Sequence, residues 1–115
     1  MARSVARHKL DDQPTISTHI LDTERGAPAQ GVEVVLYHIA PGGDREVGRA
    51  VTDEDGRIRR LLDGPLQHGD YRIEFRVDGV FFGTVTLAFR VNDTSRSYHV
   101  PLLIAPYSVA SYRGS

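Results

Sequence analysis

The stretch YRIEFRVDGVFFGTVTLAFRV, residues 71–91, decides the fold class. Apolar and charged residues alternate along its first seven positions, which is the period of a strand with one buried face. Asp78-Gly79 then separates two apolar segments, and an Asp-Gly pair between strands favours a two-residue hairpin turn. The stretch therefore predicts two strands, over residues 71–77 and 80–91, joined by a tight turn.

The same period of two continues outward in both directions from this stretch. It predicts further strands over residues 16–22, 32–39, 45–52, 57–62 and 97–104, separated by turns rich in Gly, Asp and Pro. No helical pattern is longer than a turn or two, and no segment repeats. Seven to eight short strands in about 100 residues are typical of an all-β sandwich.

Composition narrows the possible partners. The chain has 115 residues and a net charge of −1, which allows one domain and gives no basic face for nucleic acid or an anionic membrane. It has no cysteine, so disulfides, thiolate nucleophiles and Cys-ligated zinc are excluded. No apolar run has the length of a secretory signal core or a membrane span. We expect a cytoplasmic protein with a mobile N-terminal arm over residues 1–14 and one domain over residues 15–115.

Two histidines and one arginine fall on the outward side of predicted strands. Along residues 16–22 the alternation places the apolar side chains on one face and His19 on the other. The same rule places His99 and Arg57 opposite the apolar residues of their own segments. An imidazole titrates near neutral pH and can take a proton from water, particularly beside a second imidazole and a cation. The pattern does not place the three together, and two solvent-facing histidines are an equally good interpretation of it.

Other kinds of site have weaker signals. Three histidines could hold zinc, but the chain has no HxH or HxxxH pair. The GxSxG elbow of a serine hydrolase is missing, and Gly42-Gly43 is not followed by a helix, as a phosphate loop would be. His8 and His68 are expected in solvent, and His38 at the edge of the core. We therefore expect no metal and no cofactor.

Four segments together resemble a known family. ISTHILDTERGAPAQGVEVVLY, TDEDGR, GDYRIEF and YHVPLLIAPYSVASYRGS resemble, in this order and spacing, the 5-hydroxyisourate hydrolases, also called transthyretin-related proteins. The resemblance covers Ile16 to Ser115, and the terminal YRGS separates these hydrolases from transthyretin, a hormone carrier with the same fold. It implies a transthyretin-like (prealbumin-like) β-sandwich that forms a homotetramer, with active sites in the groove where dimers meet.

The resemblance also implies a reaction and its residues. The reaction would be hydrolysis of 5-hydroxyisourate, a cyclic amide, to a ureidoimidazoline acid (2-oxo-4-hydroxy-4-carboxy-5-ureidoimidazoline) in urate degradation. The motifs assign catalysis to His19, Arg57 and His99. They assign substrate binding to Tyr112, Arg113, Gly114 and Ser115. A small-molecule carrier without hydrolase activity is the alternative, and a sandwich that only mediates protein contacts is a third possibility.

Three departures from the family pattern bear on the pocket rim. Ser97 stands where the family has a histidine, and the connection over residues 78–83 lacks the family's short helix and FFP motif. The segment before YRGS reads APYSVAS instead of SPYGYST. Residues 100–112 carry no charge, and contiguous apolar surface of this kind marks an interface, which is consistent with the expected homotetramer.

Overall fold

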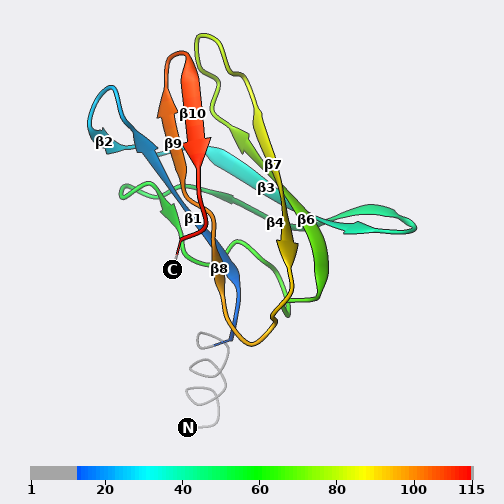
Figure 1. The fold of residues 1–115 in the computed structure, drawn as a ribbon. Helices are drawn as coiled ribbons and strands as arrows, with labels where there is room; N and C mark the ends of the chain where they lie inside the picture. Colours follow the sequence, from blue (N-terminus) through cyan, green and yellow to red (C-terminus); the bar gives the residue numbers. More distant parts are fainter. Residues whose placement is uncertain (1–12, 115) are drawn as a thin grey trace, which may run out of the picture.

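Two β-sheets packed face to face form the protein in the computed structural model, which describes residues 13–114 (Figure 1). Most of the expected N-terminal arm, and Ser115, lie outside the described residues. Over residues 13–114 the chain forms ten strands and no helix. The strands are β1 (Ile16–Asp22), β2 (Ala27–Pro28), β3 (Glu33–Ala40), β4 (Gly43–Val51), β5 (Arg57–Ile58), β6 (Gly69–Arg76), β7 (Val85–Val91), β8 (Tyr98–His99), β9 (Leu102–Ala105) and β10 (Ser108–Ser111).

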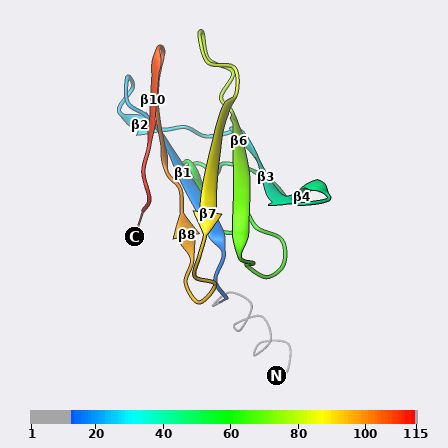
Figure 2. The same ribbon diagram turned by 45° about the vertical axis from the view of Figure 1, so that its right-hand side comes forward.

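The strand order puts β1 at the centre of the larger sheet. That sheet runs β10-β9-β1-β2, and the short strands β5 and β8 also pair with β1. The smaller sheet runs β4-β3-β6-β7, and Figure 2 shows the two sheets as separate layers. The all-β sandwich expected from the sequence is confirmed. Within residues 13–114 no helix is long and apolar enough to cross a membrane.

The core lies between the inward faces of the two sheets. On β1, Ile16, Thr18 and Ile20 are almost fully buried, whereas the alternate residues are half-buried on the outer face. Each fully buried aliphatic side chain contributes roughly 1.5–3 kcal/mol relative to an exposed one. A shift of β1 by one residue would expose all of its buried set. The face assignment made from alternation is therefore confirmed for this strand.

The predicted two-residue hairpin at Asp78-Gly79 is wrong. β6 ends at Arg76 and β7 begins only at Val85, so residues 77–84 form a longer connection. The amide of Asp78 donates to the Gly83 carbonyl at 2.9 Å, which closes this connection as a loop. Phe81 is 66% exposed and its ring packs on Phe82 and on Tyr107 of the β9–β10 turn. Within this loop Val80 and Phe81 are exposed, whereas Phe82 packs against the core.

The predicted strand over residues 97–104 is divided, and a strand after it was missed. β8 and β9 are separated at Val100 and Pro101, because proline has no backbone N–H to donate to a ladder. β10 then turns back and pairs antiparallel with β9. Its sequence, SVAS, has too little alternation to predict a strand. The segment 57–62 is a strand only at Arg57 and Ile58, since Leu61 and Leu62 are both buried and break the period of two.

Candidate active site

Strand pairing brings the three sequence-predicted catalytic residues onto one outer face. β1 pairs antiparallel with β5, and His19 stands directly opposite Arg57. On its other side β1 pairs in parallel with β8, and Ser17 stands opposite His99. Directly opposed residues share a face of the sheet, as do residues two apart along a strand. His19, Arg57, His99 and Ser17 therefore share the outer face of the larger sheet.

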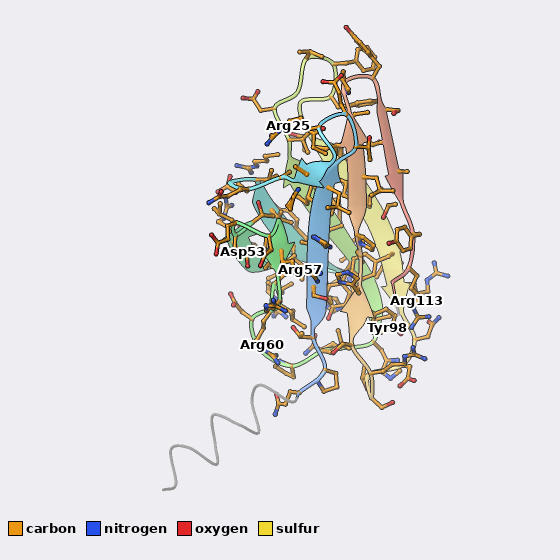
Figure 3. The ribbon with its side chains drawn as sticks, turned by 90° about the vertical axis from the view of Figure 1, so that its left-hand side faces the viewer. Arg25, Asp53, Arg57, Arg60, Tyr98 and Arg113 are labelled. Carbon is orange, nitrogen blue, oxygen red and sulfur yellow. The ribbon has the colours of Figure 1, made fainter. Side chains whose placement is uncertain are left out.

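The TDEDGR turn presents Arg57 to β1. The Asp53 side chain accepts hydrogen bonds from the amides of Asp55 and Arg57 at 2.9 and 3.0 Å, which closes the turn. Gly56 has a φ of +73°, and a Cβ there would lie 2.4 Å from the Ile20 carbonyl oxygen, so only glycine fits. The Gly56 carbonyl accepts from the Ile20 amide at 2.8 Å and joins the turn to β1. Figure 3 shows Asp53 and Arg57 on this turn beside β1.

The His99 imidazole is held from two sides. Its Nδ1 lies 2.8 Å from Ser17 Oγ. On another side, Gly114 donates its amide to the His99 carbonyl at 2.8 Å, and a Cβ on Gly114 would lie 2.4 Å from the ring Cδ2. The chain that follows β10 therefore runs on beside β8, where Gly114 forms a bridge with His99, and Figure 1 shows the described end of the chain close to β8.

Burial, together with the neighbouring His19 and Arg57, favours the neutral form of His99. Partial burial lowers the pKa of His99 below its ordinary value of 6.5, and the charges of His19 and Arg57 lower it further. His99 is therefore mostly neutral at pH 7 and able to accept a proton.

Two open depressions meet at Arg57. One, of about 320 Å³, is lined by Ser17, Thr18, Arg57, Ile58, Arg59, Ser97 and His99. The other, of about 600 Å³, is lined by His19, Leu21, Pro28, Asp55, Arg57 and Arg59. His99 and His19 thus line different depressions that share Arg57, whose guanidinium has no carboxylate partner among residues 13–114. An unpaired guanidinium can bind the oxygen and nitrogen acceptors of a planar ligand.

The described residues of the predicted substrate-binding tail lie beside His99. Gly114 lies against the His99 ring, and Tyr112 and Arg113 line, together with His99, a third depression of about 300 Å³ between the tail and β7. The Arg113 guanidinium stacks 4.6 Å from the centre of the Tyr98 ring, and Figure 3 shows the two side by side. Tyr112 is 59% exposed. Ser115 lies outside the described residues. Within one chain, therefore, Gly114, Tyr112 and Arg113 lie beside His99, whereas Tyr112 and Arg113 do not line the depressions that contain Arg57 and His19.

Two contributors to the site were missed from the sequence. Ser17 contacts His99, and its position two residues before His19 on the outward face was a usable signal. Arg59 borders both depressions, and its place two residues after Arg57 carried the same signal. Among residues 13–114, no three His, Asp or Glu side chains gather closely enough to hold a metal ion.

Comparison with known proteins points to one family. The model of the HIUase/Transthyretin family matches residues 16–114. The 5-hydroxyisourate hydrolase of Deinococcus radiodurans is 41% identical over 119 aligned positions, which cover 92% of this chain and 100% of that protein.

Solved structures of a hydrolase and of a transthyretin both have the fold of this chain. Klebsiella pneumoniae 5-hydroxyisourate hydrolase superimposes with a TM-score of 0.76 and 34% identity, covering 88% of this chain and 99% of that one. Sea bream transthyretin in complex with thyroxine superimposes with a TM-score of 0.77 and 25% identity, covering 86% and 93%. Of these two proteins the hydrolase is more similar to this chain in sequence, while both are similar to it in fold to nearly the same degree.

Proposed function

The chain belongs to the HIUase/Transthyretin family, and from this membership we infer that it is a hydrolase that opens the ring of 5-hydroxyisourate. The product is the ureidoimidazoline acid, and the step belongs to urate degradation. The observation that carries the proposal is the shared outer face of His19, Arg57 and His99 across β5, β1 and β8. Two imidazoles and an unpaired guanidinium suit hydrolysis, whereas an apolar carrier channel has no need of them.

We propose that His99 and His19 orient and deprotonate the attacking water. Neutral His99 would take a proton from the water, whose oxygen then bonds to a ring carbonyl carbon. Arg57 would hold the planar ring and stabilise the negative charge that develops on the carbonyl oxygen. When the ring C–N bond breaks, the imidazolium returns the proton to the leaving nitrogen. The lowered pKa of His99 and the unpaired state of Arg57 among the described residues support these roles.

We further propose that the tail residues bind substrate in a homotetramer. Gly114 already lies at His99, and Tyr112, Arg113 and Ser115 would complete the wall of a pocket formed where dimers meet. The exposed side chains of Tyr107 and Tyr112 support an interface on this side of the molecule. The proposal includes no metal and no cofactor. A cytoplasmic location remains a prediction from the sequence.

The test of the proposed function is decay of freshly oxidised urate, followed by ultraviolet absorbance. Catalytic amounts of the protein should accelerate the loss of the 5-hydroxyisourate signal. A carrier would bind the compound stoichiometrically and leave the rate of decay unchanged, and a protein that only mediates contacts would do neither. Unchanged decay at catalytic concentration would therefore exclude the hydrolase.

A further inference from the structure

The contact between Ser17 and His99 is built into the centre of the larger sheet. The two residues stand opposite each other in the parallel pairing of β1 and β8. Ile16 and Thr18, on either side of Ser17, are buried in the core, which fixes the direction of the Ser17 side chain. The 2.8 Å separation of Ser17 Oγ from His99 Nδ1 therefore depends on the sheet and not on a flexible loop.

The rest of the His99 ring has different surroundings. Gly114 packs against the Cδ2 edge, and His99 lines the depression that holds Arg57. Among residues 13–114, His99 Nε2 has no hydrogen-bond partner. The only partner of Ser17 Oγ within the same range is His99. One ring nitrogen is thus occupied by the protein, and the other is left for a ligand or water.

We infer that Ser17 is a positioning residue, whose Oγ accepts a hydrogen bond from Nδ1–H of His99 and so leaves the Nε2 lone pair free to act as the base. This inference rests on the proposed function, because only a base needs that lone pair. A neutral imidazole carries one proton, and the bond made by one nitrogen sets the state of the other. With the proton on Nδ1, Nε2 can take the proton of the attacking water.

The same hydrogen bond persists through the reaction. Once Nε2 has taken the proton, Nδ1–H still donates to Ser17 Oγ, now from a positively charged ring, and such charge-assisted bonds are stronger. Ser17 thereby stabilises the imidazolium relative to the neutral ring. It does so without touching the substrate.

The direct test is ¹⁵N NMR of the histidine rings in the substrate-free protein above the His99 pKa. The His99 signals are assigned by their loss in His99→Gln. We expect the Nδ1–H tautomer in the parent protein and a shift toward Nε2–H in Ser17→Ala. An Nε2–H tautomer in the parent protein would overturn the inference, and this measurement needs no turnover. It therefore separates the failure of this inference from failure of the proposed function.

Kinetics give the second test. Ser17→Ala should lower kcat at least tenfold, but by less than the ~10²–10⁴-fold that a general base contributes. KM should change little. Ser17→Thr keeps an Oγ and should restore most of kcat. Thr23→Ala is the matched control, because it removes a hydroxyl that donates to the Ile104 carbonyl at 3.0 Å, between the end of β1 and β9 and away from His99. Parent-like kcat in Ser17→Ala would contradict the positioning role.

Discussion

At the scale of single residues, the protonation of His99 depends on residues of the neighbouring strands. The pKa of His99 is lowered by burial first and then by His19 and Arg57, which belong to β1 and β5. A lowered pKa means that His99 loses its proton at a lower pH than a free histidine. In a pH profile of kcat, the pH at which activity drops to half its maximum on the acid side should therefore lie below 6.5, the ordinary pKa of histidine.

Replacing Arg57 by Gln should raise the pKa of His99, because the positive charge of Arg57, which opposes protonation of the ring, is removed. The pKa should stay below 6.5, since partial burial of the ring is unchanged. The measurement is a pH titration of the His99 ring by NMR. A lower or an unchanged pKa of His99 in Arg57→Gln would show that Arg57 does not act on His99 electrostatically.

Replacing His19 or His99 by Ala should remove most of the activity and leave the protein folded. Neither side chain belongs to the core, and a general base contributes ~10²–10⁴-fold to the rate. The urate-coupled assay measures the loss, and thermal unfolding checks the fold. His68→Ala, in the exposed loop before β6, is the control and should keep parent-like turnover. Near-normal activity of either active-site variant would refute the proposed histidine mechanism.

At the scale of elements, short connections set the position of each functional group. The TDEDGR turn is joined to β1 through Gly56, and the segment after β10 returns to β8 through Gly114. Both glycines are required because another residue's Cβ would collide with a neighbour at 2.4 Å. At Gly114 the neighbour is the His99 ring itself, so this position links the tail directly to the proposed base.

Gly114→Ala should therefore reduce activity more than it reduces stability. The added methyl group must displace either the tail or the His99 ring, whereas the core lies on the opposite face of β8. We expect a fall in kcat with a small change in Tm. Gly42→Ala, in the β3–β4 turn with open space around its Cβ, is the matched control. Equal activity of the two variants would show that the tail does not position His99.

At the scale of the whole molecule, the sandwich leaves aromatic surface uncovered at one end. Figures 1 and 2 place the loop between β6 and β7 beside the β9–β10 turn, and the Phe81 and Tyr107 rings lie 6.1 Å apart there. Both side chains are more than 60% exposed, at 66% and 74%. β7 and β10 are also the outer strands of their sheets and present unpaired backbone groups.

We expect light scattering at micromolar concentration to give four times the mass of one chain. Association would cover the apolar residues of the 100–112 segment and would bring Tyr112 and Arg113 to a groove between chains. The contrary result is a monomer that is active in the urate-coupled assay. Such a monomer would show that the site is complete within one chain.

The sequence by itself determined the positions of most long strands and the face on which their side chains lie. The bounds of β1 were predicted to the residue, and His19, Arg57 and His99 were correctly placed off the core, because alternation is a local property of the backbone. Family motifs added the reaction and the candidate residues. Local pattern failed at residues 77–84 and at β10, where contacts between loops or with a neighbouring strand decide the structure.

Only the tertiary structure decided which residues meet. Ser17 and His99 are 82 positions apart, and no periodicity in either segment indicates that β8 lies beside β1. That neighbourhood arises because both strands bury their inward side chains in one core, which aligns their outward side chains opposite each other. The position of the tail beside His99 and Tyr98 has the same origin, since the pairing of β10 with β9 sets where the last described residues lie.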